Sequence, residues 1–303
     1  NWKTEIRPAV LKRANNCCEF CGVENGAWGD WCTDGKFHTA EMQAERGLPD
    51  GVDFLKEKPK ILFEIFLEDY SKLFDIDKDK SRNILKSGEL FKRLTEEWYK
   101  ELNNNNLENA YKVYDDDYYF VDIFNCYVNY SRNYIKRIIK SSCFDELQKC
   151  ESVIDIGCGI SYSTSLLKQI FPESRVFAIN LENTKQWKFC ELMSTEMNFI
   201  LLNSIDKIEQ NVDIVFASEY FEHIYNPTKH IDDIVNKLKP KYMIIANAFN
   251  TWSIGHFEKY EYDNTIVEQN KISKMFNKHL INLGYEKMKC KMWNNRPIVW
   301  KKI

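Results

Sequence analysis

One short segment constrains the fold of this 303-residue chain more than any other. An apolar run begins at Val153, passes through Asp155 and ends in Gly157-Cys158-Gly159. A run of this kind, followed at once by closely spaced glycines and an amphipathic stretch, is typical of a buried strand that turns tightly into a helix. The glycines let a ligand lie against bare backbone in the crevice outside the strand ends.

Short apolar runs alternate with amphipathic stretches through residues 150–303. The runs predict strands at 153–156, 176–179, 199–202, 213–216, 242–246, 285–292 and 298–301. Helices are predicted at 162–170, at 184–197, after the capping pair Asn226-Pro227, and up to a C-terminal cap at Gly284. This alternation predicts an α/β, Rossmann-like domain whose sheet is mostly parallel, with an antiparallel last strand.

The N-terminal half divides into two further regions, at 1–50 and 51–149. In the second region, apolar residues recur at helical spacing, for example Leu62 with Phe66, and Val121 with Phe124. We interpret these sets as helix core. Four basic residues on the later helix, Arg132, Lys136, Arg137 and Lys140, are expected to form a solvated face, with a phosphate contact as the alternative.

Bulk composition excludes several classes of protein. The net charge of -3 gives no global positive field that would attract nucleic acid, although a local basic patch stays open. No run approaches the ~18 apolar residues of a membrane helix. The ten cysteines form no evenly spaced framework, which favours reduced thiols and a cytoplasmic location.

Two common glycine-loop sites do not fit the segment after Val153. A dinucleotide fold requires a third Gly or Ala where this chain has Tyr162, whose bulk would block a pyrophosphate. A phosphate-binding P-loop requires Gly-Lys-Ser/Thr, which does not follow here. Asp155, directly before the loop, suits a cationic ligand better than a phosphate.

Residues 152–250 resemble the class I S-adenosylmethionine (SAM) dependent methyltransferases. The segment Asp155-Ile-Gly157-Cys158-Gly159 is similar to the first motif of that family, an acid followed by Gly-x-Gly. The resemblance implies that the two glycines pack against the methionine part of SAM. It also implies that Asp155 interacts with the amino group of SAM.

The same resemblance places further cofactor residues at the next three strand ends: Asn180 and Glu182, Asn203 and Ser204, and Ala217 and Ser218. The family has an acid at the first of these ends to hold the ribose hydroxyls. Here Asn180 takes that place, so either it binds the ribose without a charge or Glu182 does so instead. Asn203 or Ser204 would bind the adenine edge, with a simple turn as the alternative, and the backbone at 217–218 would face the cofactor.

Candidate catalytic residues follow the fourth and fifth predicted strands: Glu219, Glu222, His223 and His256. The first three resemble a Glu-His loop of the small-molecule branch of the family. Histidine is the usual proton acceptor near neutral pH, so His223 or His256 is a candidate base for an oxygen or nitrogen nucleophile. For His223, a structural role in the loop is the alternative. The segment 218–221 lacks the Asp/Asn-Pro-Pro-Tyr/Phe motif of amino-methylating DNA enzymes, and it holds no Pro-Cys nucleophile.

The N-terminal 35 residues resemble the first knuckle of an HNH-type zinc finger, as found in phage and mobile-element proteins. Cys18 and Cys21 have zinc-ligand spacing, and Cys32 and His38 are the candidates for a second pair. The catalytic histidine-rich part of such nucleases has no match, so nuclease activity is not predicted.

We therefore predict a zinc-knuckle-like segment (1–50), a helical cap (51–149) and a SAM-binding domain (150–303). The predicted activity is SAM-dependent methyl transfer to an oxygen or nitrogen of a small molecule, nucleotide or nucleic acid, with SAM and, at the knuckle, zinc as bound groups. One alternative is a nucleic-acid or partner-binding protein with a degenerate SAM domain. Another is an enzyme that uses SAM without methylating. The sequence fixes neither the acceptor nor the oligomeric state, and it gives no sign of a membrane partner.

Overall fold

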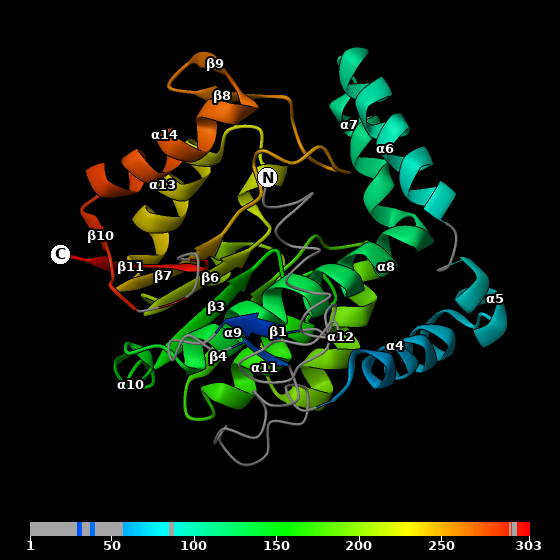
Figure 1. Ribbon diagram of the computed structural model, residues 1–303, viewed down its shortest axis with the longest axis horizontal. Coiled ribbons are helices and arrows are strands. Elements are labelled where there is room, and N and C mark those ends of the chain that lie inside the picture. Colours follow the sequence, from blue (N-terminus) through cyan, green and yellow to red (C-terminus); the bar gives the residue numbers. More distant parts are fainter. Residues whose placement is uncertain (1–28, 32–36, 40–56, 85–87, 291, 293–295) are drawn as a thin grey trace, which may run out of the picture.

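The computed structural model describes residues 29–31, 37–39, 57–84, 88–290, 292 and 296–303. Its centre is a seven-stranded sheet with the order β10-β11-β7-β6-β3-β4-β5 (Figure 1). A two-stranded pair, β1 (Gly29–Trp31) and β2 (Phe37–Thr39), lies outside this sheet. Of the residues predicted to bind zinc, Cys18, Cys21 and Cys32 lie outside the described residues, and only the backbone of His38 is described.

Five neighbouring strands of the sheet are parallel: β3 (Ser152–Ile156), β4 (Arg175–Ile179), β5 (Ile200–Leu202), β6 (Ile214–Ser218) and β7 (Tyr242–Ala246). The strand β11 (Ile298–Lys302) runs antiparallel to β7 and pairs with β10 (Tyr285–Lys287). The predicted Rossmann-like fold with an antiparallel edge is confirmed. Because the chain leaves β3 toward β4 and later returns to β6 on its other side, β3 stands at the switch point where such sheets bind ligands.

Helices cover both faces of the sheet (Figure 1). On one face lie α11 (Tyr162–Ile170) and α12 (Lys185–Met197), which share a core cluster with the β3 residue Val153. On the other lie α13 (Pro227–Leu238) and α14 (Gln269–Asn282), which share a second cluster with Ile154. Alternate residues of β3 therefore face different layers, which explains why the strand reads as a continuous apolar run.

The helical region consists of α4 (Pro59–Phe74), α5 (Lys78–Ile84), α6 (Gly88–Asn103), α7 (Leu107–Ala110), α8 (Asp117–Cys126), α9 (Arg132–Ile139) and α10 (Phe144–Leu147). A π-helical turn, 127–131, joins α8 to α9. Phe66 of α4 stacks on Phe124 of α8 with ring centroids 5.0 Å apart, and it also contacts Phe189 of α12. The region is thus packed directly onto the sheet domain. No helix in the described part of the chain is long and apolar enough to cross a membrane.

Two features differ from the expectations. A hairpin that was not predicted, β8 (Lys259–Tyr262) and β9 (Thr265–Glu268), precedes the helix that was expected to run to Leu283, and this helix begins at Gln269. Asp263 and Asn264 both have positive φ, which suits a tight two-residue hairpin turn. The solvated basic face is also wrong in part, since Arg132 and Lys136 are only 3% and 4% exposed. Their long apolar stems can pack in the layer where α9 contacts α11.

Candidate active site

A cavity of about 970 Å³ opens at the carboxyl ends of the parallel strands, between the sheet and the helical region. Its volume is near the upper end of the ~300–1,000 Å³ typical of small-molecule sites. Residues from the ends of β3, β4, β5 and β6 line one part of it. Side chains of α8, the π-helical turn and the segment 248–256 line the rest.

The turn after β3 brings bare backbone to the cavity. Gly157 and Gly159 have φ of +72° and +57°, and both line the cavity. A Cβ on Gly157 would lie 2.1 Å from Cδ2 of Tyr220, and a Cβ on Gly159 would lie 2.6 Å from Cγ2 of Ile123. Both positions therefore require glycine for their conformation and for their close contacts. Cys158, between them, also lines the cavity.

Asp155 is a buried residue of β3, and it lines the same cavity. One of its oxygens, Oδ2, accepts hydrogen bonds from the hydroxyls of Ser163 and Thr164 on α11, each at 2.7 Å. Burial raises the pKa of Asp155 to about 6, and the two hydroxyls oppose that shift. The carboxylate is thus held in place with its second oxygen left for another partner.

The polar side chains after β4 already form hydrogen bonds, either with the backbone or with another side chain. Asn180 donates through Nδ2 to the carbonyl of Gly159 at 2.7 Å, and its Oδ1 accepts from the N–H of Leu181 at 2.8 Å. Glu182 does not line the cavity, and its carboxylate accepts a hydrogen bond from Nδ2 of Asn203. The Asn180 amide therefore supports the glycine turn in this structure.

Three of the remaining cofactor candidates line the cavity: Asn203, Ser204 and Ser218. Oδ1 of Asn203 is buried and has no hydrogen-bond partner among the described residues. An unpaired acceptor beside a cavity suits a ligand that donates, such as the exocyclic amine of adenine. Ser218 pairs instead with Ser131 of the π-helical turn at 2.9 Å, and Ala217 is fully buried inside β6, away from the cavity.

Two carboxylates predicted to be catalytic, Glu219 and Glu222, lie close together just after β6. Glu219 lines the cavity and accepts hydrogen bonds from the hydroxyl of Tyr134 at 2.9 Å and from Nη2 of Arg296 at 3.0 Å. Burial raises the pKa of Glu219, and the Arg296 charge opposes that shift. Glu222 is fully buried and accepts from the N–H of Ala248 at 2.7 Å. Burial and the Glu219 charge raise the pKa of Glu222 well above its usual range.

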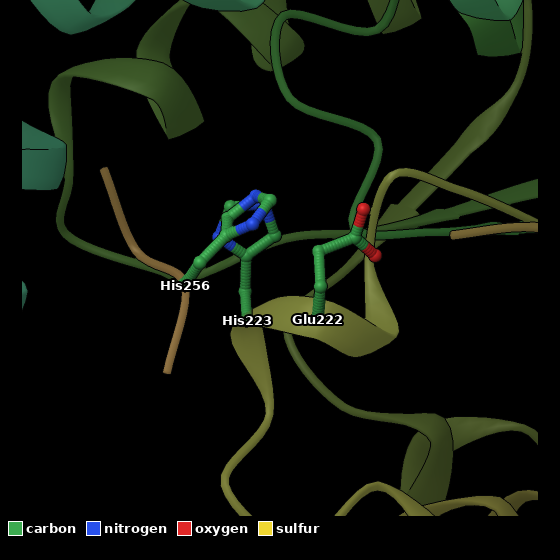
Figure 2. A group of neighbouring side chains, drawn as sticks. All are labelled: Glu222, His223 and His256. Carbon is green, nitrogen blue, oxygen red and sulfur yellow. The ribbon is translucent and has the colours of Figure 1, made fainter. Parts of the chain in front are cut away.

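The two predicted catalytic histidines meet although they are distant in sequence. The rings of His223 and His256 lie with centroids 4.8 Å apart, nearly perpendicular, and both line the cavity (Figure 2). Nδ1 of His256 donates to the carbonyl of Thr251 at 2.7 Å, which leaves the lone pair on Nε2. Nδ1 of His223 shares a hydrogen bond of 3.0 Å with the hydroxyl of Tyr114. Burial lowers the pKa of His256 to about 4 and that of His223 well below its usual range, so both rings are neutral at pH 7.

Several site residues could not be found from sequence spacing. Tyr114, Asp122 and Arg296 line the cavity but come from the helical region and the last hairpin. Tyr220 lies against Gly157, and its hydroxyl pairs with Nε2 of His230 at 2.9 Å. Each depends on long-range packing, and no local motif marks it.

The chain has detectable relatives over this part of its length. Residues 154–246 match the protein family described as "Methyltransferase domain". A ubiquinone biosynthesis O-methyltransferase, found in two strains of Rickettsia bellii, is 26% identical over 121 residues, which are 39% of this chain and 49% of that protein. The chain therefore spans about half the length of these curated relatives.

Solved structures of methyltransferases resemble the chain more distantly. An S-adenosylmethionine-dependent methyltransferase from Clostridium acetobutylicum has a TM-score of 0.43 at 13% identity, over 60% of this chain and 97% of that one. A fibrillarin/Nop5p complex has a TM-score of 0.36 at 19% identity, over 50% of this chain and 70% of that one. At these scores the likeness carries no argument about function.

The family match and the strand order agree with each other. Residues 154–246 match a methyltransferase domain, and they hold most of the parallel part of a Rossmann-like sheet. The matched residues run from the strand before the glycine turn to the end of β7, so they include the parts of the sheet that shape the cavity.

Proposed function

We propose that this protein transfers the methyl group of SAM to an oxygen or nitrogen atom of an acceptor bound in the cavity. The observation that carries the proposal is the turn from Asp155 to Gly159. It presents an anchored carboxylate and bare backbone to a cavity at the switch point of the sheet. A cationic ligand with a donor amine and a flat base suits these features better than a phosphate ligand does.

The described residues fit SAM in three places. The methionine part would lie against Gly157 and Gly159, and its amino group would face the free oxygen of Asp155. The adenine would lie toward Asn203, whose Oδ1 has no partner among the described residues. Because the Asn180 amide is taken up by backbone, the ribose hydroxyls would gain little from it, and Glu182 would have to leave Asn203 to bind them.

The reaction needs alignment more than it needs a strong catalyst. The acceptor attacks the methyl carbon, the bond between that carbon and sulfur breaks, and the electron pair stays on sulfur. The products are the methylated acceptor, S-adenosylhomocysteine and a proton. Holding both substrates in one enclosed cavity supplies most of the rate. His256 is the better-placed proton acceptor of the two histidines, because Thr251 fixes its tautomer and leaves Nε2 unprotonated.

We call the part of the cavity beside Glu219, His223 and His256 the acceptor part. The lining favours a flat, apolar small molecule over a nucleic acid there. The aromatic side chains of the cavity include Phe91, Tyr111, Tyr114, Tyr119 and Trp252. Arg296 is the only Lys or Arg among the described lining residues, and it is already hydrogen-bonded to Glu219. Asp122, whose pKa burial raises to about 6, adds another acid. A phosphate-bearing acceptor would therefore meet too little positive charge. The relatives named as O-methyltransferases support oxygen as the acceptor atom.

The first experiment measures SAM binding and methyl transfer separately. Isothermal calorimetry with SAM tests the cofactor site alone. Labelled SAM is then incubated with the protein and a cell extract, and the products are separated into small molecules, protein and nucleic acid. We expect binding, and label among the small molecules. Label in nucleic acid would contradict the acceptor class. Binding without any label would favour a SAM-using protein that does not methylate. No binding by the folded protein would overturn the proposal and favour a partner-binding protein with a degenerate domain.

A further inference from the structure

Three potential metal ligands converge at the acceptor part of the cavity, and two of them line it. Glu222, His223 and His256 each offer one ligand atom, and these atoms all lie within 4.8 Å of one another. Figure 2 shows Glu222 and His223 rising side by side from one short turn, while His256 reaches in from a separate segment to meet the His223 ring. The carboxylate stands beside the ring pair, with its oxygens directed to one side.

The histidines already have the outer contacts that metal-binding histidines use. A ligating imidazole usually donates its other N–H to a carbonyl, a carboxylate or water, which fixes the ring and its tautomer. His256 does this through Nδ1 to the Thr251 carbonyl. Nδ1 of His223 is held by the hydroxyl of Tyr114. Nε2 of His256 is therefore available to a ligand. Nε2 of His223 is available in the tautomer whose Nδ1 carries the proton and donates to the Tyr114 hydroxyl.

The carboxylates provide a second reason to expect a cation here. Glu222 is fully buried, and Glu219 lies close enough to interact with it. A buried carboxylate without a positive partner is costly. Arg296 binds Glu219 directly, but Glu222 has a backbone N–H as its hydrogen-bond donor. A divalent ion between Glu222 and the histidines would supply the missing charge.

We propose that Glu222, His223 and His256 bind a divalent transition-metal ion, with Glu219 close enough to bind it or a ligand of it. Two imidazoles and one carboxylate are a donor set that suits zinc, iron, manganese or cobalt better than magnesium or calcium. Three protein ligands leave coordination positions open on the side of the cavity. This is distinct from the zinc site predicted at Cys18 and Cys21.

The catalytic role of the ion rests on the proposed methyl transfer. The binding of the ion to the protein does not depend on that proposal. An acceptor hydroxyl on an open position would have a lower pKa and would lose its proton to water before it attacks the methyl group. His223 and His256 would then act as ligands, and neither would be the base. The same position would hold the acceptor at a fixed angle to SAM.

The test uses cobalt as a spectroscopic probe on the untagged 303-residue chain. The protein is treated with a chelator, dialysed and titrated with Co²⁺ while the visible absorption is recorded. Binding to nitrogen and oxygen ligands gives visible bands without the near-ultraviolet band of cobalt bound to thiolates. We expect one ion per chain with these visible bands in the Cys18→Ser/Cys21→Ser double variant. That variant removes the other candidate site and keeps Glu222, His223 and His256.

Variants of the ligands locate the ion. His256→Gln and Glu222→Gln should each weaken cobalt binding by more than about 100-fold, because even changes behind the ligands cost ~10–100-fold. The control is His279→Ala, which removes a histidine that pairs with Asp232, and neither of these residues lines the cavity. It should bind cobalt as the wild type does. Circular dichroism of each variant establishes that it is folded.

Three outcomes would overturn the site. They are no cobalt bands in the double variant, bands that persist in both ligand variants, or equal loss in His279→Ala. Each is measured without SAM, so failure of methyl transfer does not affect the result. If cobalt binds as expected but a chelator leaves methyl transfer unchanged, the ion is present and its catalytic role is wrong.

Discussion

The two parts of the cavity are built in different ways. The cofactor part is made of short segments that directly follow β3, β4 and β5, and its key contacts join neighbouring turns, such as Asn180 to Gly159. The acceptor part is assembled from residues far apart in the sequence. Tyr114 touches His223, Trp98 of α6 donates to the carbonyl of His256 at 2.7 Å, and Arg296 reaches Glu219.

The cofactor part of the cavity follows from the fold in general, whereas the acceptor part is particular to this chain. A turn at the end of a parallel strand is fixed by sheet geometry, so any sequence with this fold can place a ligand there. The acceptor part depends on helices and loops outside the matched segment 154–246. Changes in the two parts should therefore affect cofactor binding and turnover independently.

The largest expected effect is the loss of SAM binding on changing the glycine turn. In Gly157→Arg, the side chain would collide with the Tyr220 ring and fill the place of the methionine part. We expect no binding of SAM by calorimetry, a loss of more than about 1,000-fold. The matched control is Gly284→Ala, which alters another glycine with positive φ, at the end of α14. It should lower the melting temperature without changing the Kd for SAM.

If Gly157→Arg stayed folded and bound SAM normally, the cofactor would not lie on this turn. If both glycine variants weakened SAM binding equally, the effect would come from the fold and not from the turn.

A substitution in the acceptor part of the cavity should lower turnover and leave SAM binding unchanged. His256→Gln removes either a proton acceptor or a metal ligand, so we expect kcat to fall by about 100-fold or more. The Kd for SAM should stay within about threefold of the wild type, because the ring does not touch the glycine turn. Single-turnover kinetics and calorimetry measure the two quantities. A parallel loss of SAM binding would show that the two parts of the cavity are not separate.

The same contrast explains what could be predicted from the sequence. The turn from Asp155 to Gly159 and the sheet order follow from local patterns, because a buried strand, two glycines and a helix are contiguous. That His223 and His256 meet does not follow from any spacing, since each stands after a different strand. The hairpin turn at Asp263-Asn264 carried a local signal that the helical pattern obscured. The sequence also predicts Arg132 on the surface, whereas its side chain is buried. The charge of a residue does not show which face of its helix packs against the rest of the protein.

A pH dependence should distinguish the cofactor part further. Burial raises the pKa of Asp155 from 3.8 to about 6, so its carboxyl is ionised at pH 7 and becomes protonated as the pH falls below 6. Its attraction for the SAM amino group is lost in that direction, and we expect the Kd for SAM to rise by up to about tenfold between pH 7 and pH 5. Asp155→Asn should bind more weakly at pH 7 and show little change over this range. A wild-type Kd that is flat with pH would exclude this contact.

The raised pKa of Asp155 affects stability in the opposite direction: a rise in pH should strengthen SAM binding but weaken the contribution of this group to folding. Between pH 3.8 and about 6 the folded protein holds the Asp155 proton more tightly than the unfolded chain does, so this group favours folding less as the pH rises. Urea unfolding of the wild type and Asp155→Asn at both ends of this interval measures the difference.

The smallest expected effect on SAM affinity concerns the residue that departs from the family pattern. Asn180→Asp restores an acid at the end of β4, but it also removes the Nδ2 donor to Gly159 and sets a carboxylate against that carbonyl. Losing this part-buried hydrogen bond costs about 1 kcal/mol. We therefore expect a lower free energy of unfolding in urea and a Kd for SAM within about threefold of the wild type. A clear gain in SAM affinity would mean instead that the amide is replaceable, and that the turn after β4 can hold the ribose as the family pattern implies.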